Sequence, residues 1–139
     1  MRIAVSGCLL GENCKYNGGN NYSEKLAAFL KDHEVIGICP ETLGGLPTPR
    51  EPAEIVAGVV RRKDGVSVDE AFRKGAQRAL EIVLAQKAEL VILQSRSPSC
   101  GVKAVYDGTF SGSVIPGKGI FAALLAQNGI AAMDIEDLK

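Results

Sequence analysis

The chain has 139 residues, of which 46% are hydrophobic and 23% are charged, a composition typical of one globular domain and unlike that of a disordered chain. Sixteen basic residues balance sixteen acidic ones, so the net charge gives no general attraction to nucleic acid or to an anionic membrane. No apolar run approaches the length of a membrane-spanning helix. The first eight residues lack the apolar stretch of a signal peptide, and we therefore expect a cytoplasmic protein.

Short apolar runs alternate with segments that have helical signals. The first run is followed by a Gly- and Asn-rich loop over 7–21, and Ser23 is placed to cap a helix that extends to about Asp32. The segment 39–52 holds four prolines and two glycines, which predicts an irregular structure. The predicted strands are 2–6, 34–39, 89–94 and 130–135.

The second half of the chain begins with a predicted hairpin over 54–68, turning at Lys63-Asp64-Gly65. Ser67 and Glu70 fit a capping box for the longest helix, about 68–88, and a last helix over about 119–128 ends before Gly129. The buried stripe of the long helix is predicted to be Phe72, Ala76, Ala79, Leu80 and Val83. We predict an α/β fold: a single domain over 1–139, with an open parallel sheet of about four strands, helices on both faces and a small β-hairpin insertion.

Three of the four cysteines follow predicted strands. Cys8 comes two residues after the first strand, Cys39 ends the second, and Cys100 lies six residues past the third. Ligands of open parallel sheets bind outside the carboxyl ends of the strands, so neighbouring strands would bring these thiols together. In a reducing cytosol such a cluster indicates metal binding or catalysis, although each cysteine alone could be a small buried hydrophobe. Cys14 is a candidate fourth ligand, a sulfur acceptor or a bystander.

Polar residues lie on the same loops. Glu41 follows Cys39 by two residues, Ser97 and Ser99 precede Cys100, and Arg50 and Arg96 add fixed positive charge. Carboxylates and hydroxyls beside a metal or a thiolate can transfer protons and orient a substrate. The alternative is that Glu41 caps a turn and that the serines bond their own backbone.

One further stretch is similar to a phosphate-binding loop. Residues 112–119 match the first seven positions of a P-loop, but Gly119 stands where a magnesium-binding Ser or Thr belongs, which argues against a nucleotidase. The helix N-terminus that follows could still bind an anionic or carbonyl group.

Taken together, the motifs resemble the DUF523 family, the domain of the 2-thiouracil desulfurases, over almost the whole chain. The segments that carry the resemblance are Ser6-Gly-Cys-Leu-Leu-Gly11, Cys14-Lys-Tyr-Asn-Gly-Gly19, Cys39-Pro-Glu-Thr-Leu-Gly-Gly-Leu-Pro-Thr-Pro-Arg50, Ser95-Arg-Ser-Pro-Ser-Cys-Gly101 and Tyr106-Asp-Gly-Thr-Phe-Ser111.

The resemblance implies a [4Fe–4S] cluster held by Cys8, Cys39 and Cys100, with the fourth iron free to take the sulfur of a substrate. It implies that Glu41 is the acid/base and that Ser97 or Ser99 assists. The implied reaction is a non-redox hydrolytic removal of sulfur from a thiolated pyrimidine such as 2-thiouracil. We expect the cluster to be lost from protein purified in air.

Three residues are expected to contact the substrate: Asn17, Arg50 and Arg96. Asn17 stands where the family usually has Asp, a departure that predicts weaker activity or a different substrate.

Two other function classes remain open from the sequence. In the first, Cys14 closes a four-cysteine site, and the protein is a non-catalytic metal or redox-sensing module. The second is recognition of thiolated RNA, against which the neutral charge and the seven aromatic residues argue. No sequence feature specifies an oligomeric state.

Overall fold

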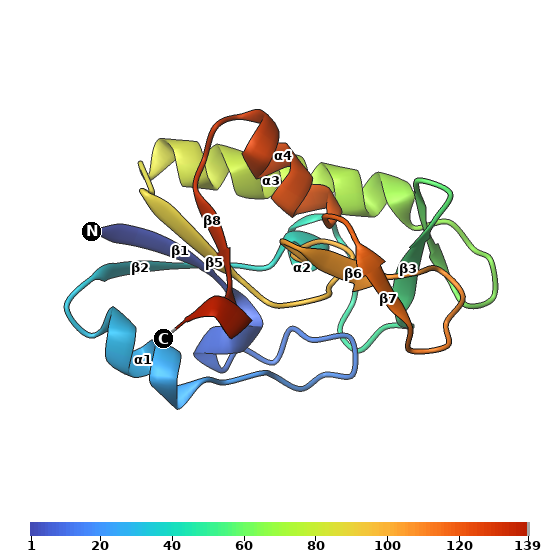
Figure 1. The fold of residues 1–139 in the computed structure, drawn as a ribbon, viewed down its shortest axis with the longest axis horizontal. Helices are drawn as coiled ribbons and strands as arrows, with labels where there is room; N and C mark the ends of the chain where they lie inside the picture. The colour runs from blue at the N-terminus through green and yellow to red at the C-terminus, as the bar shows by residue number, and fades with distance from the viewer. Residues whose placement is uncertain (139) are drawn as a thin grey trace.

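A four-stranded parallel sheet forms the centre of the computed structural model, which describes residues 1–138 (Figure 1). β1 (Arg2–Ser6) pairs with β2 (Glu34–Ile38) on one side and with β5 (Leu90–Leu93) on the other, and β8 (Ala132–Asp134) pairs with β5. The strand order is therefore β2-β1-β5-β8. The predicted α/β fold with an open parallel sheet is confirmed, and the first three predicted strands are neighbours.

Helices cover both faces of the sheet. On one face α3 (Asp69–Ala85) and α4 (Ile120–Gln127) pack against Ala4, Val91 and Leu93. On the other face Ile3, Val5 and Ile92 pack with α1 (Glu24–Leu30) and with Leu138, which follows the short helix η2 (Ile135–Asp137). Alternate residues of each strand thus serve opposite cores, as the period of a strand requires. No helix within residues 1–138 is both long enough and apolar enough to cross a membrane.

The predicted helix ends are only partly right. Ser23 caps α1, because its Oγ accepts a hydrogen bond from the Leu26 N–H at 3.1 Å. The predicted stripe of α3 is buried, but the capping box of Ser67 and Glu70 does not form: Val68 is the N-cap and makes no side-chain cap bond. The Asp69 side chain makes a different contact. Its Oδ1 accepts a hydrogen bond from the Val60 N–H at 3.0 Å, which connects the start of α3 to the preceding hairpin strand.

The predicted turn at Lys63-Asp64-Gly65 forms, since the Arg62 N–H donates to the Val66 carbonyl across it and Arg61 bridges Ser67, but an earlier turn in the same segment was not predicted. β3 (Ala53–Val56) and β4 (Val59–Arg62) are joined at Ala57 and Gly58, both of which have positive φ, as a two-residue hairpin turn requires. Asp64-Gly65 forms a second turn, in which the Gly65 N–H donates to the Arg62 carbonyl.

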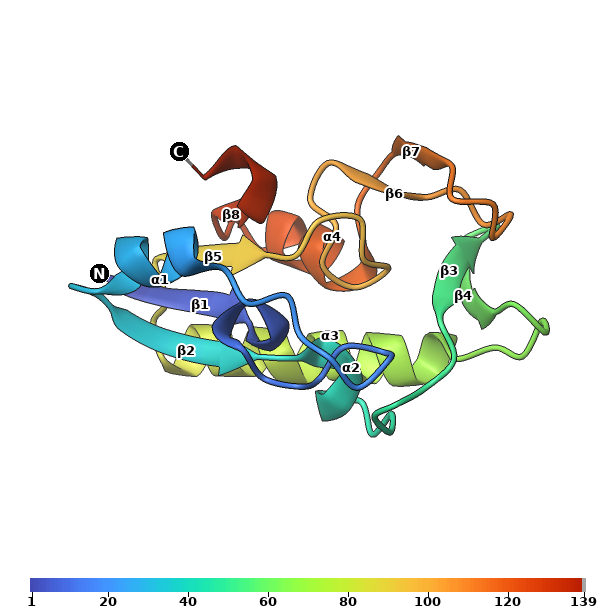
Figure 2. The same cartoon turned by 90° about the horizontal axis from the view of Figure 1, so that it is seen from below.

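Short elements outside the predicted strands and helices complete the fold. They are η1 (Gly7–Leu10), α2 (Pro40–Leu43) and the hairpin of β6 (Ala104–Tyr106) and β7 (Val114–Pro116). α2 begins with Pro40 at its first position, where a missing N–H costs no helical hydrogen bond. In Figure 2 the two hairpins lie beyond the carboxyl ends of the sheet strands, at the end of the molecule opposite the N-terminus.

α2 packs on α3 through backbone rather than side chains. A Cβ atom on Gly75 of α3 would overlap the Pro40 carbonyl, and a Cβ on Gly44 would overlap the carbonyl of Ala71. Glycine is therefore required at both positions for the close approach of the two backbones. The position of Cys39 and Glu41, which flank Pro40, depends on this contact.

We expect Gly75→Ala to destabilise the protein by about 2 kcal/mol or more, because the overlap with Pro40 outweighs a gain of about 1 kcal/mol in helix propensity. Urea unfolding followed by circular dichroism measures the change. Lys74→Ala, at the exposed neighbouring position, is the control and should shift stability by less than about 0.5 kcal/mol. A Gly75→Ala protein as stable as the wild type would show that the two backbones are not in contact.

Candidate active site

A cavity of about 810 Å³ opens at the carboxyl ends of β1, β2 and β5 and extends toward the two hairpins. This is the edge of an open parallel sheet at which ligands bind. Its lining includes the four cysteines, several charged side chains and an apolar wall: Cys8, Cys14, Cys39, Cys100, Lys15, Glu41, Arg50, Glu54, Arg96, Ser97, Leu46, Phe72, Tyr106 and Phe110.

The four cysteines reach the cavity from four different segments. Cys8 lies on η1 directly after β1, Cys39 caps α2 at the end of β2, and Cys100 lies in the loop after β5. Cys14 lies farther along the loop that follows η1. All four are free thiols. Within the described chain, no three His, Cys, Asp or Glu side chains lie close enough together to hold a single metal ion.

Cys39 has the most polar surroundings of the four thiols. Its Sγ lies 3.3 Å from the donating Thr42 hydroxyl, 3.7 Å from Glu41 Oε2 and 3.9 Å from the Cys14 carbonyl. A hydrogen bond with the Cys14 thiol lowers the pKa of Cys39 to about 7, against burial and the charge of Glu41, which raise it. The same hydrogen bond, followed by burial, raises the pKa of Cys14.

Cys8 and Cys100 lie in more apolar surroundings. Burial raises the pKa of Cys8, and the Asn21 amide, which donates to its Sγ at 3.5 Å, opposes the shift. Cys100 is only 4% exposed, and burial raises its pKa well above the usual value, with a hydrogen bond from Ser6 acting in the opposite direction. Burial of this kind disfavours a free thiolate and is offset when a cation binds the sulfur.

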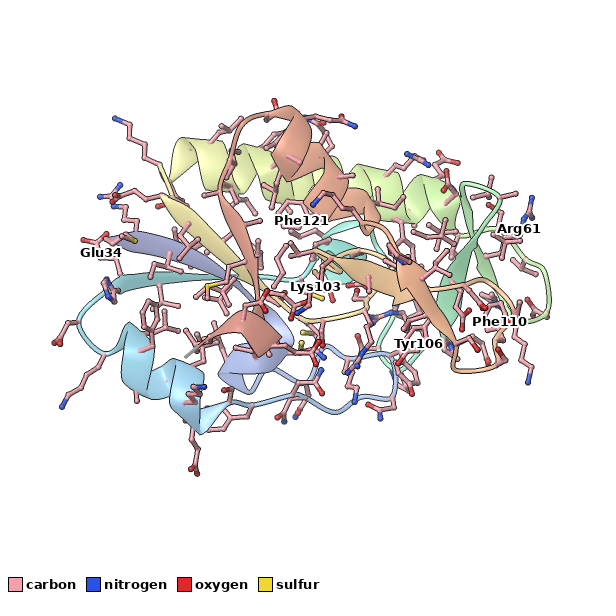
Figure 3. The ribbon with its side chains drawn as sticks, in the orientation of Figure 1. Glu34, Arg61, Lys103, Tyr106, Phe110 and Phe121 are labelled. Atoms are coloured by element: carbon pink, nitrogen blue, oxygen red, sulfur yellow. The ribbon has the colours of Figure 1, made fainter. Side chains whose placement is uncertain are left out.

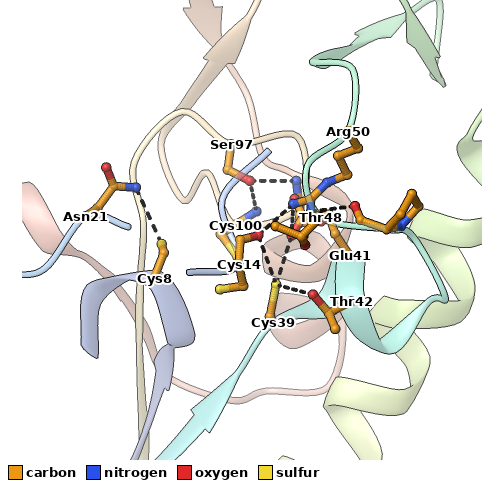
Figure 4. A network of polar contacts seen from close by, with 12 residues as sticks. Cys8, Cys14, Asn21, Cys39, Glu41, Thr42, Thr48, Arg50, Ser97 and Cys100 are labelled. Atoms are coloured by element: carbon orange, nitrogen blue, oxygen red, sulfur yellow. Dashed lines mark hydrogen bonds and ion pairs between the residues drawn. The ribbon is translucent and has the colours of Figure 1, made fainter. Parts of the chain in front are cut away.

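Glu41 lies in the first turn of α2, next to the cysteine that caps this helix. Its side chain is 13% exposed and its Oε2 lies 3.9 Å from Arg50 Nη2 (Figure 4). The carboxylate therefore faces both a thiol and a fixed cation at the cavity wall.

The two candidate serines have different positions. Ser97 lines the cavity, and its Oγ accepts hydrogen bonds from the Ser99 and Cys100 N–H groups, each at 3.1 Å. Ser99 is fully buried, does not line the cavity, and its Oγ has no hydrogen-bond partner among the described residues. Of the two, the structure brings only Ser97 to the site.

The N-terminus of α4 is not free to bind an anion, so that prediction is wrong. The Ile120 N–H donates to the Pro98 carbonyl, and the N–H groups of Phe121 and Ala122 donate to the Ser99 carbonyl. These amides hold the loop that carries Cys100, and they leave no donor of the first helical turn open to the cavity.

Two of the three residues expected to contact the substrate, Arg96 and Asn17, lie at different distances from the cavity: one is at its rim and the other is outside its lining. Arg96 lies at the cavity rim with its side chain 45% exposed, and it is 3.9 Å from Glu136. Asn17 is exposed and does not line the cavity; its Oδ1 accepts the Gly19 N–H at 2.9 Å within its own turn.

Sequence reasoning missed Glu54, which joins the two hairpins. Its Oε1 accepts hydrogen bonds from the Gly108 N–H at 2.9 Å and the Phe110 N–H at 3.2 Å. Phe110 has a φ of 58°, a sparsely populated conformation for a bulky residue. Figure 3 shows Tyr106 and Phe110 on the hairpin side of the molecule, and both line the cavity. Only the spatial pairing of the hairpins, which no local pattern signals, identifies Glu54 as part of the wall.

We expect Glu54→Ala to loosen the far wall of the cavity, because two partly buried N–H groups lose their acceptor. The free energy of unfolding should fall by about 1–3 kcal/mol. Amide exchange of residues 107–111 should become about tenfold faster or more. Glu81→Ala, an exposed carboxylate on α3, provides the control and should change neither measurement. Unchanged exchange over 107–111 would contradict the role of Glu54.

Comparisons with known proteins agree with this architecture. The family model for 2-thiouracil desulfurase matches residues 3–137. Protein YbbK of Bacillus subtilis (strain 168) is 40% identical over 147 aligned positions, which cover 99% of this chain and 97% of YbbK. The solved structure of the [4Fe-4S]-dependent thiouracil desulfidase TudS matches with a TM-score of 0.92 and 39% identity, covering 99% of this chain and 92% of that one. The chain therefore belongs to the 2-thiouracil desulfurase family, a family of enzymes that act on carbon–sulfur bonds.

Proposed function

We propose that this protein removes sulfur from a thiolated pyrimidine base of the 2-thiouracil type by hydrolysis. In this reaction 2-thiouracil and water give uracil and hydrogen sulfide, so oxygen replaces sulfur with no net transfer of electrons. The observation that carries the proposal is that Cys8, Cys39 and Cys100 line one cavity together with the carboxylate of Glu41. Four free thiols also suit a reducing cytoplasm, the compartment we propose.

The donor set fits an iron–sulfur cluster. Thiolates are the usual protein ligands of such clusters, and three thiols spaced around a cavity suit a group larger than a single ion. The [4Fe-4S] dependence named for TudS supports the same cofactor here, held by Cys8, Cys39 and Cys100. When bound, the cluster would supply an iron without a protein ligand, a Lewis acid that polarises a thiocarbonyl sulfur.

The chain itself supplies binding and proton transfer. Glu41 Oε2 takes a proton from the water that attacks the carbon carrying the sulfur, and then returns a proton to the leaving sulfur. The Ser97 Oγ already accepts hydrogen bonds from two backbone N–H groups. Its own hydroxyl hydrogen is therefore directed away from them and can form a hydrogen bond to the substrate.

Cys14 supports a second candidate function. It lines the same cavity, and the neighbouring Cys39 thiol raises the pKa of its own thiol. If all four cysteines bound one metal group, no coordination position would be open, and the site would be structural or redox-sensing rather than catalytic.

We expect the anaerobically reconstituted protein to convert 2-thiouracil to uracil and sulfide in equal amounts, measured by chromatography and sulfide assay. Glu41→Gln keeps the shape of the side chain but cannot move a proton, so kcat should fall about 100-fold or more. Glu81→Gln, on the exposed side of α3, is the matched control and should retain full activity. A wild-type protein with a full cluster and no turnover of any thiolated base would refute the proposal.

A cysteine-to-serine series distinguishes the open site from the closed one. Replacing Cys8, Cys39 or Cys100 should abolish or strongly reduce the bound iron and its visible absorption, whereas Cys14→Ser should keep both. Iron and acid-labile sulfide are counted per chain after anaerobic reconstitution. Loss of the cluster in Cys14→Ser would favour the four-cysteine alternative.

A further inference from the structure

The guanidinium group of Arg50 is engaged by the protein's own cavity wall. Its side chain is only 11% exposed. Nη1 donates to the Pro47 carbonyl at 3.3 Å and to the Thr48 hydroxyl at 3.1 Å. Nη2 donates to the Cys14 carbonyl at 3.0 Å and lies 3.9 Å from Glu41 Oε2 (Figure 4). Both terminal nitrogens are therefore occupied by oxygen atoms of the chain.

These contacts join the loop after α2 to the first turn of that helix and to the loop after η1, which at Cys14 is 36 residues away in sequence. Pro47 and Thr48 belong to the loop after α2, Glu41 to the first turn of α2, and Cys14 to the loop after η1. The backbone adds a further tie, since the Arg50 N–H donates to the Tyr16 carbonyl at 2.7 Å. Arg50 thus holds the loop of residues 14–16 against the start of α2.

Cys39 lies where the tied groups meet. Its Sγ is 3.7 Å from Glu41 Oε2 and 3.9 Å from the Cys14 carbonyl, the two oxygens that Nη2 also faces. A planar guanidinium can hold several oxygens in fixed directions, which a lysine ammonium cannot do. Arg96, with a half-exposed side chain at the rim, is the arginine better placed to meet a substrate.

We propose that Arg50 is a positioning residue, not a substrate-binding one: it fixes the Glu41 carboxylate and the Cys14 carbonyl beside Cys39. This inference rests on the proposed function, because it assigns Glu41 the proton transfer. A carboxylate that is already held in the reactive orientation pays a smaller entropic cost to reach the transition state of proton transfer. Loss of Arg50 should therefore slow the chemical step.

The kinetic test compares Arg50→Lys with the wild type on 2-thiouracil. We expect kcat to fall about 10- to 100-fold while KM stays within about threefold. The lysine keeps the positive charge but loses the planar guanidinium that holds several oxygens in fixed directions. Arg50→Ala should be no better than Arg50→Lys. Arg2→Lys is the matched control: Arg2 lies 2.7 Å from Glu34 and donates to the Gln86 carbonyl at 3.1 Å, outside the cavity and away from α2, so its loss should leave kcat and KM unchanged.

A second measurement needs no turnover and no cluster. In cluster-free protein, amide exchange over residues 12–19 should become about tenfold faster in Arg50→Lys, because the loop loses the side-chain bond to the Cys14 carbonyl and keeps only the backbone bond at Tyr16. The iron content after reconstitution should match that of the wild type. The thermal midpoint shows whether each variant is folded. If Arg50→Ala does not fold, the test rests on Arg50→Lys, which is the milder change.

Each outcome decides between the roles. A rise in KM at unchanged kcat would assign Arg50 to the substrate and overturn the inference, as would unchanged exchange over residues 12–19. If the wild type turned over no thiolated base, the proposed function would fail. In that case the exchange measurement alone would still show whether Arg50 positions the loop.

Discussion

Parallel pairing of β1 with both β2 and β5 is the constraint from which the site follows. The register places Ser6 beside Ile38 and Val5 beside Ile92, so the strands end level with one another. Because successive residues of β1 face opposite cores, a shift by one residue would exchange the buried faces of the whole strand. Core packing on both faces therefore fixes the positions at which the segments carrying Cys8, Cys39 and Cys100 leave the sheet. The arrangement of the cavity thus depends on a strand register that is set by the hydrophobic cores and not by the thiols or polar residues of the cavity.

A second constraint sets the fine position of Cys39 and Glu41. Both belong to the start of α2, a helix of four residues that is too short to be stable by itself. It is held by the direct backbone approach of Gly44 and Pro40 to α3 at Gly75. On the opposite side, the guanidinium group of Arg50 connects α2 to the loop that carries Cys14. The proposed acid/base is thus held between the hydrophobic core and a polar network.

The sequence was sufficient for the parts of the fold that repeat a local pattern. The sheet strands, the cap at Ser23 and the buried stripe of α3 follow from hydrophobic period and turn chemistry, and the placement of cysteines after strands predicted a shared edge. It was insufficient where tertiary contacts decide. α2 lies in a proline-rich segment and forms because α3 offers a glycine, while the hairpin turns at Ala57, which has no turn signal of its own. Glu54 and Arg50 act through partners many residues away, so no local window could assign their roles.

The same distinction applies to Asn17, for which the motif resemblance implies a departure from the family's usual Asp. Read from the motif, the change of Asp to Asn removes a carboxylate from the reaction. In the structure, however, Oδ1 of Asn17 closes a turn by accepting the Gly19 N–H, a bond that an Asp oxygen makes equally well. The residue is exposed and lies outside the cavity lining, so the substitution preserves the turn and leaves the lining unaltered. Side chains that do face the cavity are therefore better placed than Asn17 to contact what enters it. On the far wall, Glu54 accepts a hydrogen bond from the Phe110 N–H, and Arg62 and Lys63 add positive charge.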